Sequence, residues 1–136
     1  MPIAEVPGVL TLEWIDKVKA TIDIWKSYAI TAEQFRDAII VKGVANAKAH
    51  GSHAWINDSS QAKGAFSPEV QKVIEEESFK TFAKIGIKYF LVIKSASAIT
   101  NMSINRYNAK TGPCGLQMVE VPDLKSAIEW LEQHPN

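Results

Sequence analysis

The sequence predicts one α/β domain over residues 1–136, with a mixed, mostly parallel sheet of five strands and four helices in the order β-β-α-β-α-β-α-β-α. Three observations predict this class. Two alternations of apolar and polar residues lie close together near the N-terminus, apolar runs then alternate with helical patterns, and capping residues mark where helices begin. Strands that alternate with helices imply right-handed crossovers and therefore parallel pairing.

The first two strands are expected to form an antiparallel hairpin with one buried face. Every second residue is apolar in "VLTLEW" (9–14) and in most of "VKATIDIW" (18–25), which is the period of a strand. On this alternation Trp25 falls on the polar face of its strand, and we expect it to be exposed near a sheet edge. An exposed aromatic side chain is commonly a contact residue. The pattern therefore predicts a homodimer with Trp25 at or near the interface.

The first helix is predicted to begin after Thr31, because Thr31 followed by Gln34 makes a capping box. It is expected to stop near His50, where Gly51 is the type of residue that commonly follows a helix. Its inner face is predicted to carry Phe35, Ala38, Ile39 and Val41.

A short strand and a second helix follow. "HAWIND" (53–58) is a short apolar strand that ends at Asp58. Ser67, Pro68 and Glu69 form a favourable helix start, because the serine caps, the proline fits the first turn and the glutamate faces the positive end of the dipole. The helix is predicted to end at Gly86, with an inner face of Val70, Val73, Ile74, Phe82 and Ile85.

The last part of the chain repeats the alternation of strand and helix. "IKYFLVI" (87–93) is apolar almost throughout, as expected of a parallel strand that is covered on both faces. Residues 97–109 have a weaker helical pattern, and "LQMVEV" (116–121) is the fifth strand. Asp123 caps a final helix, "LKSAIEWLEQ", whose apolar residues recur at helical spacing.

Charge and composition exclude some classes of partner. Fifteen basic and fifteen acidic side chains cancel, so no net field favours nucleic acid or an anionic membrane. No stretch approaches the roughly 20 apolar residues of a membrane span, and the first residues lack the pattern of a secretory signal. A cytoplasmic protein is therefore expected. Cys114 is the single cysteine, which excludes an intrachain disulfide.

The element order and several short motifs resemble the STAS superfamily, and more closely the small stand-alone SpoIIAA-like proteins of bacteria. The pieces that carry the resemblance are "WIND", "FSPEVQ", "IGIKYFLVI" and "LKSAIEWLEQ", and together they span roughly residues 9–132. The resemblance implies the STAS fold and a non-catalytic interaction module, which acts by docking to another protein or to itself.

The resemblance also draws attention to Ser67. In phosphorylated STAS switches a serine at the start of this helix accepts phosphate, and Ser67 stands at the matching place. The Asp-Ser-Ser-Gly turn of those switches is replaced here by "FSPEV" (66–70), and the "DSS" of residues 58–60 lies too early, at the strand end. We therefore expect Ser67 to cap its helix and not to act as a phosphorylation switch.

Binding of a small molecule or an anion is the alternative function. In open α/β sheets, polar groups at the carboxyl ends of strands gather where ligands bind. Asp58, Ser59, Ser95 and Ser97 could line such a crevice, with the helix start near Ser97 supplying backbone N–H groups. The competing explanation is that Asp58 caps its own loop.

The sequence has no converging set of acid, base and nucleophile, so no catalytic residue, no enzyme activity and no cofactor is predicted. His50 and His53 are close in sequence, but their surroundings suggest no third and fourth ligand, so no metal site is predicted. Cys114 lies in the turn-like "TGPCGL" (111–116), where nothing marks its thiol as activated.

Overall fold

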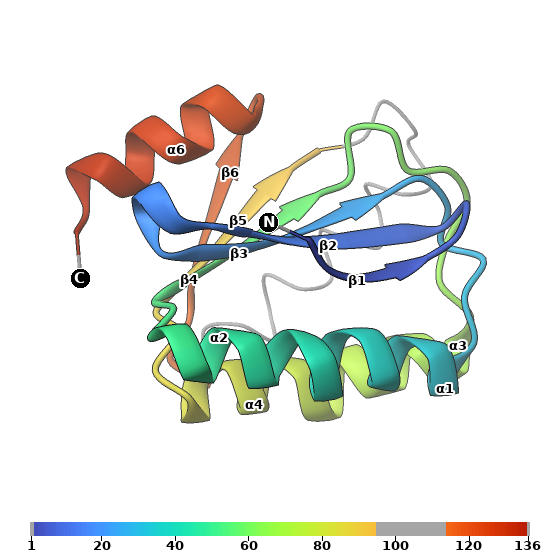
Figure 1. Ribbon diagram of the computed structural model, residues 1–136. Coiled ribbons are helices and arrows are strands. Elements are labelled where there is room, and N and C mark those ends of the chain that lie inside the picture. Colours follow the sequence, from blue (N-terminus) through green and yellow to red (C-terminus); the bar gives the residue numbers. More distant parts are fainter. Residues whose placement is uncertain (1, 95–113, 136) are drawn as a thin grey trace.

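The structure is a computed structural model that describes residues 2–94 and 114–135. The described residues form a six-stranded sheet with helices on both faces (Figure 1), in the strand order β1-β2-β3-β4-β5-β6. The first three strands pair antiparallel, and β3 to β6 pair parallel. This confirms an α/β fold with a mixed, mostly parallel sheet. The strands are β1 (Pro2–Val6), β2 (Leu10–Ile15), β3 (Ala20–Trp25), β4 (Ala54–Asp58), β5 (Tyr89–Ile93) and β6 (Gln117–Val121).

The prediction of five strands is wrong because it misses β1. This segment lies between Pro2 and Pro7, and prolines argue against a strand unless it lies at the edge of a sheet. β1 lies at the edge, where it pairs with β2 and shifts register between Pro2 and Ala4. β3 therefore lies inside the sheet, between β2 and β4.

The first helical rod runs from Ala32 to His50 and starts and ends as predicted. It consists of α1 (Ala32–Phe35), a stretch of π-helix, η2 (Arg36–Gly43), and α2 (Val44–His50). The Thr31 hydroxyl accepts a hydrogen bond from the Gln34 backbone N–H, and the Gln34 side chain accepts one from the Thr31 N–H, each at 3.1 Å. Gly51 follows at φ 66°. The prediction for Val41 is wrong, because its side chain is 59% exposed.

The second helical rod runs from Pro68 to Lys84. It consists of α3 (Pro68–Val73), a second π-helix, η3 (Ile74–Ser78), and α4 (Phe79–Lys84). Ser67 has the predicted cap role, since its hydroxyl accepts a hydrogen bond from the Val70 N–H at 3.3 Å. Gly86 follows the rod at φ 98°.

The rods lie on one face of the sheet, and α6 (Leu124–Gln133) lies on the other (Figure 1). Right-handed crossovers between strands in sequential order place their helices on the same face. Because α6 follows the last strand, it is no crossover and is free to cover the opposite face. Asp123 caps α6 as predicted, accepting a hydrogen bond from the Ser126 N–H at 2.8 Å.

The two rods and α6 correspond to three of the four predicted helices. The fourth, predicted at 97–109, lies outside the described residues. Within residues 2–94 and 114–135, no helix combines the length and the apolar character that crossing a bilayer requires.

Each face of the sheet carries its own apolar core. The core under α6 is aliphatic, with Ile22, Ile56 and Leu91 at its centre. The core under the two rods is rich in aromatic rings. The expected antiparallel hairpin is confirmed, since β2 pairs antiparallel with β3 and buries one face. β3 is covered on both faces, so the expectation of one buried face is wrong for this strand.

Trp25 is only 1% exposed, so its predicted exposure is wrong. The polar side of the alternation in β3 faces the helical rods and not solvent, and Thr21 and Asp23 on that side are buried as well. A buried Trp25 has no surface to offer a partner, and the interface predicted at this residue loses its basis.

Candidate binding site

A buried carboxylate lies inside the aromatic core. Asp23, in the middle of β3, is 5% exposed. Its Oδ1 accepts a hydrogen bond from Trp25 Nε1 at 3.0 Å, and its Oδ2 accepts one from Trp55 Nε1 at 2.7 Å. Both donors are neutral indoles, and no ion pair of the described residues involves Asp23. The carboxylate is therefore hydrogen-bonded without a neutralising cation in the described part of the chain.

Burial raises the pKa of Asp23 to about 7; the two indole donors lower it, and the charge of Asp58 raises it further. Removing a carboxylate from water favours its neutral form, which is the dominant effect here. At neutral pH Asp23 is consequently divided between its charged and its neutral form, which is unusual for an aspartate.

A cavity of about 20 Å³ lies beside Asp23. This volume corresponds to about one water molecule. Asp23, Asn57 and Ser78 contribute polar groups to the lining, and the Ser78 hydroxyl is buried without a hydrogen-bond partner. Most of the remaining wall is aromatic: Trp25, Phe35, Phe66, Phe79, Phe82 and Phe90.

Both π-helices border this cavity. Ile39 of η2 and Ile74 and Ser78 of η3 line it, so both rods contribute their wider turns to the same place. π-type turns inside α-helices occur frequently at functional sites. Together with the buried carboxylate, they make this cavity the candidate binding site of the described residues.

A second chain of polar groups connects the cavity to the end of β4. The Ser59 hydroxyl, which is fully buried, donates to Asn57 Oδ1 at 2.5 Å, and Tyr28 Oη hydrogen-bonds to the same hydroxyl. Because Ser59 donates to Asn57, Tyr28 is the donor in the second bond. Burial raises the pKa of Tyr28, so it remains a neutral donor. Ser59, which the sequence predicts to bind a ligand, thus orients the side chain of Asn57 through this hydrogen bond.

Phe66 is the most exposed aromatic residue of the cavity wall. It is 7% exposed, the highest value among the six aromatic residues of the wall. Its ring stacks on Tyr28, with centroids 3.9 Å apart, and meets Trp25 edge to face at 5.0 Å. Phe66 lies on the loop between β4 and α3, which the Tyr28 N–H ties down by a hydrogen bond to the Lys63 carbonyl at 3.0 Å.

Of the four residues predicted to line a crevice at the strand ends, the structure describes Asp58 and Ser59, and these two make separate hydrogen bonds. Asp58 Oδ1 accepts hydrogen bonds from the Ser60 N–H at 3.0 Å and the Ser60 hydroxyl at 2.6 Å, so it caps its own loop. The described strands also follow one another in sequential order, without the reversal that opens a crevice in such sheets. Ser95 and Ser97 lie outside the described residues.

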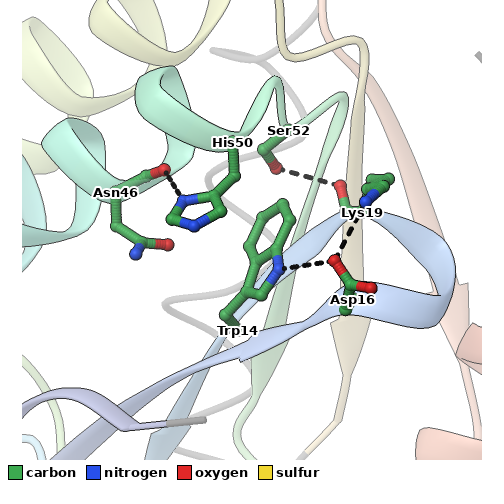
Figure 2. A network of polar contacts seen from close by, with 6 residues as sticks. All are labelled: Trp14, Asp16, Lys19, Asn46, His50 and Ser52. Carbon is green, nitrogen blue, oxygen red and sulfur yellow. Dashed lines mark hydrogen bonds and ion pairs between the residues drawn. The ribbon is translucent and has the colours of Figure 1, made fainter.

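His50 and His53 lie in different environments, since His50 is exposed and His53 is buried. The His50 ring contacts the Trp14 ring with centroids 5.0 Å apart, and its Nδ1 hydrogen-bonds to the Asn46 carbonyl at 2.9 Å (Figure 2). His53 is buried at the start of β4. Cys114 is half-buried with a free thiol. Over residues 2–94 and 114–135, no three histidine, cysteine or acidic side chains gather as metal ligands.

Sequence reasoning misses Asp23 because it treats the side of β3 that carries Asp23 as solvated. The available signal is the pairing of "TIDIW" (21–25) with "WIND" (55–58), in which a polar residue follows a bulky apolar one in both strands. Parallel pairing places Asp23 opposite Asn57. Two polar groups at the same level of two covered strands indicate a buried polar site.

Comparisons with protein-family models, with curated proteins and with solved structures gave no match to this chain. The chemistry of the site therefore rests on its geometry, and membership of the STAS superfamily stays a prediction.

Proposed function

We propose that this chain is a binding protein for a small organic cation, whose ammonium head group enters the aromatic cavity and pairs with Asp23. The observation that carries the proposal is a buried carboxylate that faces a wall of aromatic rings and whose described hydrogen-bond donors are both neutral indoles. Recognition in place of turnover agrees with the non-catalytic role predicted from the sequence.

The electrostatics of the cavity favour a positive charge. A buried carboxylate without a cation has lost its hydration and gains little in return. A cation over an aromatic face gains roughly 0.5–2 kcal/mol, with tryptophan the best partner. Asp23 and the Trp25 ring both line this cavity, so a single ammonium group would lie close to both.

The volume of the cavity limits what can enter it. About 20 Å³ suits a group the size of one water molecule, such as a primary ammonium head. The body of the ligand must then extend outward, and Phe66 lies on the way. We expect the loop that carries Phe66 to open for ligand entry, as covering loops do in many binding sites.

The proposal predicts that cation binding depends on Asp23. Methylamine, which is protonated at neutral pH, is titrated into the protein by calorimetry, with methanol as its neutral analogue. We expect the wild type to bind methylammonium and not methanol, and Asp23→Asn to weaken binding roughly tenfold or more, the usual effect of losing a charge-assisted contact.

Asp37→Asn is the matched control. Asp37 is exposed and forms an ion pair with Lys42 at 3.1 Å. It is not one of the residues that line the cavity. Its removal should leave affinity unchanged. The wild type alone gives a second readout: since only ionised Asp23 attracts a cation and its pKa is about 7, affinity should rise between about pH 6 and about pH 8. Equal binding by wild type and Asp23→Asn would sink the proposal.

Docking to another protein, the function that the STAS resemblance implies, stays a prediction. The large hydrophobic side chains that are exposed on the described residues are Val41 and Leu124. They lie on helices that cover opposite faces of the sheet (Figure 1), so they form no common patch. Isolated apolar residues of this kind are normal on a protein surface, and cation binding is the function that the geometry favours.

A further inference from the structure

A second hollow lies at the opposite end of the parallel strands, where β3 and β4 begin. Its volume is about 350 Å³, within the range of small-molecule sites. The turn between β2 and β3, the start of β4 and the helix α6 all contribute to its wall. The residues that matter for its chemistry are Lys17, Val18, Lys19, His53, Leu131 and Glu132.

His53 is the feature that points to a ligand. Its side chain is 5% exposed, yet neither ring nitrogen makes a hydrogen bond of ordinary geometry. Buried polar groups are nearly always paired, and an unpaired one calls for an explanation. Burial lowers the pKa of His53, and the charge of Lys88 lowers it further, while the backbone of His134 acts in the opposite direction. The ring is therefore a neutral imidazole, and the backbone of His134 is the one group that competes with a ligand for its single N–H among the causes of the shift.

Lys19 is held firmly in place. It has φ 51°, the one positive φ of a non-glycine residue among residues 2–94 and 114–135. Its carbonyl accepts a hydrogen bond from the Ser52 hydroxyl at 3.2 Å, and its ammonium lies 2.9 Å from Asp16, which also accepts from Trp14 Nε1 at 3.3 Å (Figure 2). Asp16 thus neutralises the charge of Lys19, so Lys19 is a poor partner for an anionic ligand. Its backbone carbonyl links the turn before β3 to Ser52.

Lys17 is the cation that is available. Its ammonium lies 3.5 Å from Glu132, and the two side chains are 67% and 45% exposed. A long, exposed ion pair of this kind contributes little and is easily exchanged for another anion. Val18, Leu131 and Pro135 add an apolar wall beside it.

We propose that this hollow binds a small monocarboxylate with an apolar body. The carboxylate accepts hydrogen bonds from the Lys17 ammonium and the His53 N–H, and the body packs on Val18 and Leu131. One ammonium in an exchangeable ion pair and one neutral imidazole match a single negative charge better than a phosphate, which takes more donors. The apolar wall favours an organic acid over an inorganic ion. This site is independent of Asp23 and of the cation proposed there.

Benzoate is the probe, with benzamide as its neutral analogue and inorganic phosphate as the competing anion. The full chain is titrated while the ring nitrogens of His53 are followed by NMR. We expect benzoate to shift these resonances in a saturable way, with benzamide and phosphate producing much smaller shifts. Phosphate binding as strongly as benzoate, or an absence of any shift with benzoate, overturns the proposal.

Three variants test the assigned roles. Lys17→Met should weaken benzoate binding about tenfold, whereas Lys42→Met, which removes another exposed, ion-paired lysine away from the hollow, should leave it unchanged. Glu132→Gln frees Lys17 and removes a competing charge, so it should tighten binding several-fold. Equal effects of the two lysine variants would contradict the assignment.

His53→Leu separates a binding role from a structural one. Replacing an unpaired buried polar group by an apolar group of similar size is neutral or stabilising. The variant should therefore unfold at the same or a higher denaturant concentration while benzoate binding falls tenfold or more. A stable His53→Leu that binds benzoate like the wild type refutes the proposal.

Discussion

Asp23 shows how one side chain makes stability depend on pH. In the folded protein its pKa is about 7, and in the unfolded chain it returns to the ordinary value of about 3.9. Between these values the folded state holds a proton that the unfolded state has released. Folding is therefore less favourable as pH rises through this window, and the dependence ends above the folded pKa.

We predict that the free energy of unfolding of the wild type, relative to Asp23→Asn, falls between about pH 4 and about pH 7. The size of the fall is on the order of a few kcal/mol, since each pKa unit is worth about 1.4 kcal/mol. Urea denaturation at several pH values, followed by tryptophan fluorescence, measures it. A constant difference between the two proteins over this window would show that the pKa of Asp23 is not raised.

At the scale of residues, sequence reasoning succeeds where the chemistry is local. Thr31, Ser67 and Asp123 cap their helices as predicted, because a cap needs only a side chain and the next few backbone N–H groups. Asp23 and Trp25 fail because their burial is decided by the two rods, which come from later parts of the chain. The alternation of residues shows which side chains of a strand share a face. It does not show whether a helix or solvent covers that face.

At the scale of elements, Gly43 sets how closely the first rod approaches the sheet. A Cβ at this position would lie 2.8 Å from Leu12 Cδ2 and 2.8 Å from Trp55 Cη2. Both side chains are fully buried, and the Trp55 ring is rigid and hydrogen-bonded to Asp23. The rod and the sheet can therefore be this close because residue 43 has no side chain.

We predict that Gly43→Ala destabilises the protein by about 1–2 kcal/mol. Alanine gains up to about 1 kcal/mol over glycine in a helix, but overpacking a dense core costs about 1–3 kcal/mol. Denaturant unfolding of Gly43→Ala, Leu12→Ala and the double variant gives the coupling between the two sites. Since Leu12→Ala makes room for the new methyl group, the double variant should lose less stability than the sum of the single variants. Additive losses would exclude the clash.

The helical period itself explains why Val41 is exposed. At 3.6 residues per turn, Val41 lies about 110° from the centre of the face that Phe35, Ala38 and Ile39 form. Those three residues are buried as predicted, and Val41 turns outward. The π-helix is visible one step later, because Gly43 is buried in the place where an α-helix would present Lys42.

At the scale of the whole molecule, the alternation of strands and helices gives the α/β class and most of the strands. It does not give β1 or the covered state of β3, since both depend on pairing between segments and not on period. The homodimer expected from the sequence loses the open edge on which it was based, because β1 and β4 flank the first pair of strands.

The edge that remains beside β1 carries features that discourage pairing with another chain. β1 is five residues long, starts at Pro2, contains the exposed Glu5 and shifts register near Pro2. We therefore expect sedimentation equilibrium at high micromolar concentration to show a monomer. A dimer that Ile3→Lys dissociates would contradict this and assign the interface to β1.

The sequential order of the strands has a consequence for synthesis on the ribosome. Each strand pairs with the strand made just before it, so the sheet can grow vectorially as the chain emerges. The two rods emerge between strands and can cover their face during this growth. The aliphatic face around Ile22, Ile56 and Leu91 has to wait for α6. A nascent chain that has completed β5 but not α6 therefore leaves these aliphatic side chains without the helix that covers them. Exposed apolar surface of this kind is what chaperones bind.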